Sequence, residues 1–180
     1  MRKKYILDFC TLICSVLILS SCVGNLLLKG DYKNYSDKAS YEVLDMATTH
    51  SADAATIYFD AIEQRDFAIK FSRLLLVYRV NGQNVSSSGA RSIFDGSAVQ
   101  AVRLDPGTHT FNICWLSHSG AGFSNSCNLF LRDIELEPRK EYLVRWEINT
   151  ISKAKHNENK AEIRLLVENV TDGTLVRKSS

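Results

Sequence analysis

The sequence predicts an all-β domain, an antiparallel β-sandwich of about seven to nine short strands, preceded by an export signal and a tether. After residue 55, several runs alternate apolar and polar residues, and turn-forming residues separate these runs. No long stretch has the apolar period of a helix, which favours two packed sheets. The predicted parts are residues 1–21 (signal), 22–52 (lipidated N-terminus and tether) and 53–180 (sandwich).

The first 21 residues have the layout of an export signal. Basic residues at positions 2–4 precede an apolar run that is densest from Phe9 to Leu19, and small residues lead to Cys22. The sequence Leu-Ser-Ser-Cys that ends at Cys22 resembles the lipobox of bacterial lipoproteins. A plain secretory signal and an uncleaved anchor are the alternatives. A spanning helix needs roughly 20 apolar residues, and Asp8 interrupts the run early.

The lipobox resemblance implies that Cys22 is acylated, with palmitate-type chains, and becomes the new N-terminus. Several acyl chains on one residue satisfy the requirement for stable membrane anchoring. Val23, and not aspartate, follows Cys22. By resemblance to Gram-negative lipoproteins, this favours the outer membrane, with the domain facing the periplasm or the surface.

The charge of the exported part argues against a nucleic-acid partner. The chain has 22 basic and 20 acidic side chains, and residues 1–21 hold three of the basic and one of the acidic ones. The exported part therefore has 19 of each sign and no net charge. A neutral domain lacks the electrostatic footprint for nucleic acid or for anionic lipid.

The cysteines of the exported domain predict a disulfide. Two of the five cysteines leave with the signal and Cys22 is acylated, so only Cys114 and Cys127 remain. An oxidising compartment makes a disulfide the default for such a pair, over free thiols. A zinc site needs about four ligands, and of the four histidines only His118 lies near either cysteine. We therefore expect no metal and no cofactor.

The predicted tether is apolar at first and polar from Gly30 to Lys38. A short helix from Ser36 to Met46 and a solvated linker both fit its later part. The strands expected next are β-rich or alternating runs at 56–59, 67–71, 74–80 and 99–104. Asn81-Gly82 predicts a hairpin turn, because both central residues of a type I′ turn need positive φ.

The second half begins with a turn at Asp105-Pro106-Gly107. The strands expected after it lie at 108–116, 128–136, 142–148 and 163–167, and a hairpin turn at 171–174, which contains Gly173, leads into a last short strand at 175–177. His109 is interpreted as a strand residue and not as a ligand. Residues 117–126 are rich in glycine and serine, so we expect a loop there, with Phe123 at its centre as a candidate binding residue.

Two turn motifs resemble the PEGA-type and related small lipoprotein domains of bacteria. A strand that ends in Asn81-Gly82 is followed by Leu104-Asp105-Pro106-Gly107-Thr108-His109, which matches their proline–glycine–x–histidine turn into a strand. Residues 137–142 match a later turn, but Arg139 replaces the usual glycine and suggests a type I turn. The resemblance covers about residues 56–148 and implies a non-catalytic sandwich on the cell envelope.

No catalytic motif is found in the sequence, so we expect no enzyme. Asp133, Glu135 and Glu137 recur at every second position and are interpreted as the solvated face of a strand. The leading hypothesis is a membrane-anchored binding or structural module with an envelope protein or peptidoglycan as partner. The alternatives are an inhibitor of a foreign hydrolase, which would insert the 117–126 loop, and a hydrolase whose site is not visible in the sequence.

Overall fold

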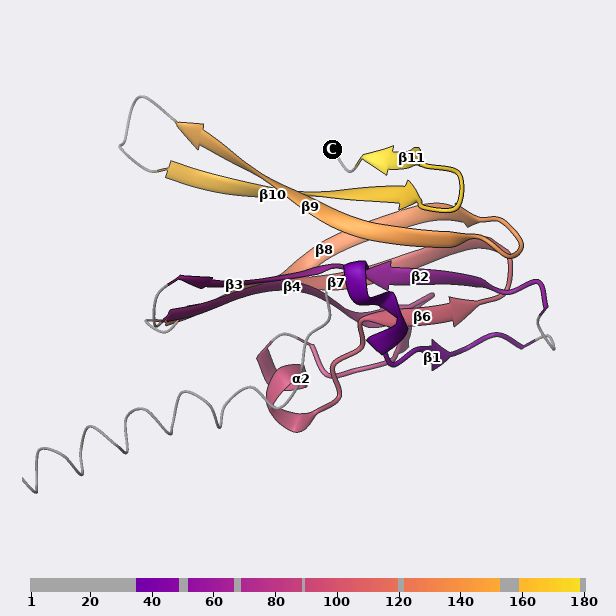
Figure 1. Ribbon diagram of the computed structural model, residues 1–180, viewed down its shortest axis with the longest axis horizontal. Coiled ribbons are helices and arrows are strands. Elements are labelled where there is room, and N and C mark those ends of the chain that lie inside the picture. Colours follow the sequence, from indigo (N-terminus) through magenta and orange to yellow (C-terminus); the bar gives the residue numbers. More distant parts are fainter. Residues whose placement is uncertain are drawn as a thin grey trace, which may run out of the picture. The chain divides into compact units, whose positions relative to one another are not determined.

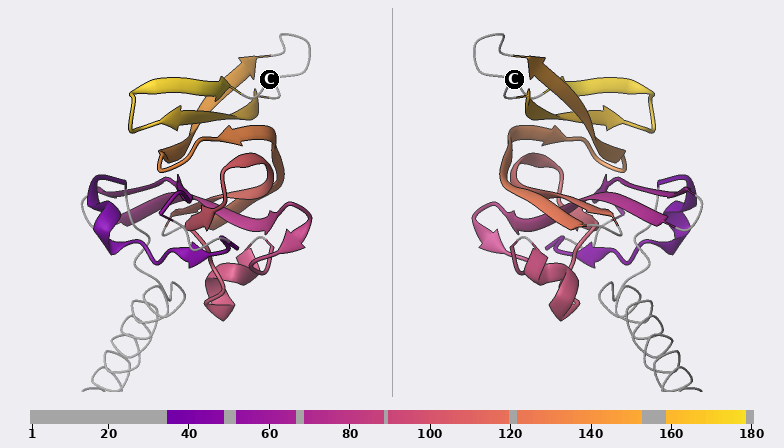
Figure 2. Two further views of the ribbon diagram at one scale, coloured as in Figure 1. Left: turned by 90° about the vertical axis from the view of Figure 1, so that its right-hand side faces the viewer. Right: turned by 90° about the vertical axis from the view of Figure 1, so that its left-hand side faces the viewer.

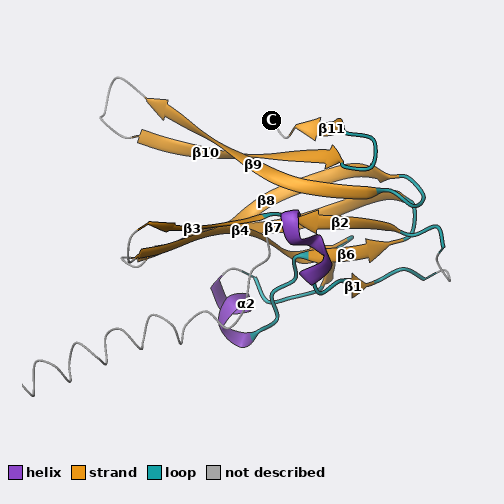
Figure 3. Cartoon of the chain, in the orientation of Figure 1, coloured by secondary structure: helices purple, strands orange, loops and turns teal. Residues whose placement is uncertain are grey.

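The computed structural model describes residues 35–48, 52–66, 69–88, 90–119, 122–152 and 159–178 (Figure 1). Helices take up few of them, as Figure 3 shows, and none is long and apolar enough to span a membrane. The helices are η1 (Tyr35–Ser40, 3-10) and α2 (Ala90–Asp95). The strands are β1 (Leu44–Asp45), β2 (Ala55–Phe59), β3 (Ala61–Asp66), β4 (Ile69–Val80), β5 (Gln83–Asn84), β6 (Ala101–Leu104), β7 (Gly107–Ser119), β8 (Gly122–Leu136), β9 (Glu141–Ser152), β10 (Asn159–Asn169) and β11 (Thr174–Lys178).

The strands form two sheets (Figures 1 and 2). The six-stranded sheet has the order β1-β6-β2-β9-β10-β11, and the five-stranded sheet has the order β3-β4-β7-β8 with β5 paired to β4. Most pairs are antiparallel, as expected, but β1 pairs with β6 and β2 with β9 in parallel. The all-β prediction is confirmed, and these two parallel pairs make the six-stranded sheet mixed.

A large hydrophobic core joins the two sheets in the described part of the chain. Both sheets contribute fully buried side chains to it, among them Ile57 and Phe59 of β2, Val77 of β4, Phe111 of β7 and Val144 of β9. Alternation along each strand turns these residues inward. The Phe59 and Phe111 rings meet edge to face, with centroids 5.9 Å apart. The arrangement is that of two sheets packed face to face across one core.

The segment predicted as a tether belongs in part to the fold. Tyr41 is buried, and the rings of Tyr35 and Tyr41 each contact Tyr58 of β2 edge to face, with centroids 5.3 Å apart. Tyr35 and Tyr41 thus cover Tyr58 and Leu143 on the outer face of the six-stranded sheet. Residues N-terminal to the predicted boundary at residue 53 thus pack on the sheet. The structure has a 3-10 helix from Tyr35 to Ser40 and a strand at Leu44–Asp45, so neither the short helix from Ser36 to Met46 nor the solvated linker describes this segment. Aromatic burial, which local periodicity does not reveal, fixes this segment.

The strands are more numerous and longer than predicted. The described residues hold eleven, and β4, β7, β8, β9 and β10 each exceed ten residues. The expected loop at 117–126 is wrong, because β7 runs to Ser119 and β8 starts at Gly122. Pairs such as Ser117↔Ser124 continue the ladder through these small residues. Pairing with a neighbouring strand overrides their low intrinsic preference for β structure.

The predicted turns are largely confirmed. Asn81 and Gly82 both have positive φ and connect β4 to β5 in a two-residue hairpin. Gly173, with φ of 69°, lies in the turn between β10 and β11. The type I turn expected at Arg139 is wrong, because this residue has φ of 62° and takes the left-handed conformation that glycine would take. Its guanidinium lies 2.7 Å from the Asp53 carboxylate.

Candidate functional site

The predicted lipid-attachment residue, Cys22, lies outside the described residues. The structure places the two cysteines that follow Cys22, Cys114 and Cys127, in a disulfide between β7 and β8. A bulge in the ladder, between the pairs Ile113↔Leu129 and Trp115↔Ser126, brings the two sulfur atoms to the same face. Without the bulge, strict alternation would put Cys127 on the face of the apolar residues of β8.

Phe123 is half-buried and lies in β8, opposite His118 of β7. The candidate binding residue therefore belongs to a paired strand near a hairpin tip and not to the centre of a loop. The insertion of this segment into a foreign hydrolase stays a prediction.

His109 has a structural role within the motif that resembles PEGA-type domains. Its Nε2 lies 2.9 Å from the Asp105 carbonyl oxygen, and because a carbonyl only accepts, Nε2 donates. In this neutral tautomer Nδ1 accepts from the Asn81 side-chain amide, also at 2.9 Å. Asn81 in turn accepts a hydrogen bond from the Thr110 backbone N–H. The histidine thus links the β4–β5 turn to the start of β7.

Asp60 is the most buried carboxylate that the structure describes, with 7% of its surface exposed. It lies where the chain leaves β2 of one sheet and enters β3 of the other. Its Oδ1 accepts hydrogen bonds from the backbone N–H groups of Tyr35 (3.3 Å) and Ala61 (3.0 Å). Arg145 Nε lies 3.5 Å from Oδ2. We call these four residues the Asp60 junction.

The backbone of Asp60 holds the two sheets together at this junction. Its N–H donates to the Val144 carbonyl of β9, and its carbonyl accepts from the Leu75 N–H of β4, each at 3.0 Å. Burial raises the pKa of the Asp60 carboxyl group, although the Tyr35 N–H and the Arg145 guanidinium lower it. Arg145 also pairs with Glu168 at 3.2 Å. The Asp60 carboxylate and backbone and the Arg145 guanidinium all have partners within the fold, so we assign the Asp60 junction a structural role.

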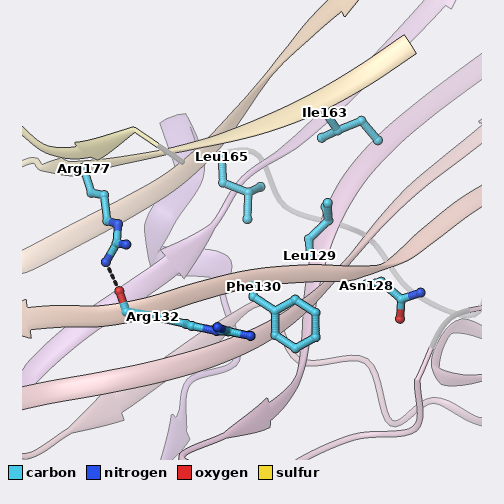
Figure 4. Close-up of a pocket in the computed structure, with 7 residues that line it drawn as sticks. All are labelled: Asn128, Leu129, Phe130, Arg132, Ile163, Leu165 and Arg177. Carbon is cyan, nitrogen blue, oxygen red and sulfur yellow. Dashed lines mark hydrogen bonds between the residues drawn. The ribbon is translucent and has the colours of Figure 1, made fainter. Parts of the chain in front are cut away.

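A hollow lies between β8 and the strands β10 and β11 (Figure 4). Its volume is about 350 Å³. We call it the β8 groove, and it is lined by Asn128, Leu129, Phe130, Arg132, Ile163, Leu165 and Arg177. Leu129, Ile163 and Leu165 form its apolar wall, whereas Asn128, Phe130, Arg132 and Arg177 are exposed. Three strands from two sheets thus build it.

The charge of the β8 groove is positive. The Arg132 guanidinium lies 5.3 Å from the centre of the Phe130 ring, a cation–π distance. The Arg177 guanidinium donates a hydrogen bond to the Arg132 carbonyl oxygen, as Figure 4 shows. No carboxylate lines the groove, and neither arginine forms an ion pair with any described residue. The groove therefore suits an occupant that is apolar in part and negatively charged.

The lining of the β8 groove offers affinity and not acid–base chemistry. It has no serine, cysteine, histidine or carboxylate, the side chains that act as nucleophiles or proton carriers. Nowhere in the described ranges do three or more metal-ligating side chains cluster. The predicted solvated face is as expected at Asp133 and Glu135, both exposed, and Glu135 accepts a hydrogen bond from Thr108 at 2.7 Å.

Two other hollows have weaker features. One of about 470 Å³ lies beside the β4–β5 hairpin, and its polar groups are used within the fold. Arg79 donates to the Asn84 side chain, and the Ser86 hydroxyl donates to the Val77 carbonyl. The other, of about 270 Å³, lies between residues 42–45 and 96–99. Neither combines an apolar wall with cations that have no carboxylate partner.

Sequence reasoning missed the β8 groove because its parts are far apart in the chain. Arg132 and Arg177 are 45 positions apart, and each looks like an ordinary charged residue of a strand. The only local signal is Phe130, an aromatic residue with 43% of its surface exposed. No protein-family model, curated protein or solved structure matches the chain. The resemblance to PEGA-type domains therefore stays a prediction.

Proposed function

We propose that the chain is a lipid-anchored lipoprotein of the bacterial outer membrane, whose β-domain is a non-catalytic binding module. The observation that carries the binding role is the β8 groove, a hollow with an apolar wall and two guanidinium groups but no nucleophile or proton carrier in its lining. The Leu-Ser-Ser-Cys sequence at Cys22 supports the anchor, and Val23 supports the outer membrane.

The anchor is tested by substituting Cys22 with alanine in the full chain. We expect Cys22→Ala to lose incorporation of a labelled fatty acid and to leave the membrane fraction. The matched control is Cys14→Ala, because Cys14 lies within the predicted signal and should not carry lipid. Unchanged labelling of the Cys22 variant would refute the anchor. Val23→Asp should move the chain toward the inner membrane on a sucrose gradient.

The binding role is tested by photocrosslinking in intact host cells. A photoreactive residue at Phe130 should give a defined crosslinked product. The same residue at Val43 should not, although Phe130 and Val43 are similarly exposed, at 43% and 39%. Equal products at both positions, or none at either, would count against a binding role for the groove.

A further inference from the structure

The β8 groove runs along a free edge of a sheet. In the part of the chain that the structure describes, β8 pairs only with β7, so its other edge has no strand beside it. Backbone N–H and C=O groups of a strand point alternately to its two edges. The Arg132 carbonyl accepts a hydrogen bond from Arg177 outside the β7 ladder, so it points to the free edge. By alternation, the backbone of Phe130 points the same way.

The accessible edge is short and bounded on both sides. Bulges disturb the β7–β8 ladder between Ile113 and Trp115 and between His109 and Phe111. Between them, the register is regular at the β8 residues Leu129, Phe130 and Leu131. Bulges are a common protection of edge strands against unwanted pairing. Here they leave an unprotected stretch of β8 directly beside the apolar wall of the groove.

We propose that this stretch binds an extended acidic peptide segment of a partner protein, which adds to β8 as a further strand. The inference rests on the proposed binding role and deepens it. Backbone hydrogen bonds to the β8 edge would give affinity, as in other cases of strand addition. Alternate side chains of the peptide would face the wall at Leu129, Ile163 and Leu165, and its carboxylates would face Arg132 and Arg177.

Charge complementarity favours this occupant over a second copy of the chain. A second β8 edge would bring two more guanidinium groups to a groove that has no carboxylate in its lining, and like charges destabilise an interface. An anionic glycan or lipid would match the arginines, but it has no amide groups to use a strand edge. Acidic side chains on an extended backbone satisfy both features.

The test uses the full chain, expressed with its own signal and purified in mild detergent. The probe is a fluorescein-labelled decapeptide of alternating glutamate and valine, and binding is followed by fluorescence anisotropy. One control probe has lysine in place of glutamate. A second keeps the glutamates but is N-methylated at alternate residues, which removes the N–H donors of one edge without changing the charge.

We expect the acidic probe to bind, and the lysine and N-methylated probes to bind at least about tenfold more weakly, since each loses several interactions of about 1 kcal/mol. The double variant Arg132→Glu and Arg177→Glu should weaken the acidic probe similarly and favour the lysine probe. The matched control is Arg73→Glu with Arg91→Glu, the same charge change at exposed positions outside the groove. If the groove variant does not fold, the N-methylated probe on the unaltered chain still decides.

Three results would overturn the proposal. The first is that the acidic probe does not bind. The second is that the N-methylated probe binds as tightly as the acidic probe. The third is that light scattering shows the free chain to be a dimer that the acidic probe does not dissociate. The last would assign the edge to a second copy. Because the test uses purified protein, it does not depend on the anchor. A chain that binds the probe but stays out of the host membrane would refute only the anchoring part of the proposed function.

Discussion

The Asp60 junction and the β8 groove both lie where one sheet meets the other, but their charged groups have different roles. At the junction, Asp60 is buried and its carboxylate has two backbone N–H donors and the Arg145 guanidinium. In the groove, Arg132 and Arg177 are exposed, and no carboxylate lies beside them. Charge at the junction is used by the fold, whereas charge in the groove is available to a partner. The two sites therefore differ in whether their charged groups have a partner of opposite charge, and not in where they lie in the fold.

The largest expected effect is that of removing the carboxylate from the junction. Asp60→Ala leaves the buried N–H of Ala61 and the partly buried N–H of Tyr35 without an acceptor, and should lower the free energy of unfolding by about 4 kcal/mol. Urea denaturation followed by tryptophan fluorescence measures it, because Trp115 and Trp146 report on different sheets.

Asp45 provides the matched control for this substitution. It also accepts a backbone hydrogen bond, from Ala47, and lies 3.5 Å from an arginine, Arg103, but its side chain is 58% exposed. Water can replace it, so Asp45→Ala should cost less than about 1 kcal/mol. Equal losses at Asp45 and Asp60 would remove the distinction between the junction and the surface.

Removal of the disulfide is expected to have the next largest effect on the free energy of unfolding. It should also loosen β8, a strand that lines the groove. The bridge closes a segment with a sequence separation of 13, and the double substitution Cys114→Ala and Cys127→Ala should cost about 3 kcal/mol in the chain-entropy model. Amide hydrogen exchange should rise in β8, next to the groove, more than at β2 and β9. Mass spectrometry of unreduced peptides is the control, and two free thiols in the native chain would contradict this prediction.

Comparison with the sequence shows which features are local. The turns at Asn81-Gly82 and Gly173 were predicted because a two-residue hairpin or a positive φ needs particular residues at those positions. The disulfide followed from elimination among five cysteines. The all-β class followed from alternation, which each strand carries in its own residues.

The features that the sequence did not predict depend on contacts between distant parts of the chain. The parallel pairing of β2 with β9 joins residues about 85 positions apart, and the alternating pattern does not state a strand's partner. The Asp60 junction likewise unites residues 35, 60 and 145. Residues 117–126 looked like a loop because glycine and serine disfavour strands, but a long neighbouring strand was enough to pair with them.

The pH dependence of stability is a smaller test of the junction. The buried Asp60 has a pKa raised by desolvation, so the folded chain holds this proton more tightly than the unfolded chain does. The contribution of this group to the free energy of unfolding is therefore full below about pH 4, the unfolded pKa, and falls as pH rises through the folded pKa. Between the unfolded and the folded pKa of Asp60, Asp60→Asn should remove this contribution to the slope of the free energy of unfolding against pH. If urea denaturation gives the same pH profile of stability for the unaltered chain and for Asp60→Asn, this prediction is contradicted.

The smallest expected effect on stability is in the groove, at Arg132. Its guanidinium is exposed and lies over the Phe130 ring, an interaction of roughly 0.5–1 kcal/mol at an exposed site. The carbonyl oxygen that binds Arg177 belongs to the backbone and stays in Arg132→Ala. We therefore expect the free energy of unfolding to change by less than about 1 kcal/mol, while binding of the acidic probe weakens about fivefold or more, the loss of an interaction of about 1 kcal/mol. Arg132→Lys, which keeps the charge, should retain most of both. A loss of stability in Arg132→Ala as large as that in Asp60→Ala would mean that the arginines of the groove serve the fold, as Arg145 of the junction does.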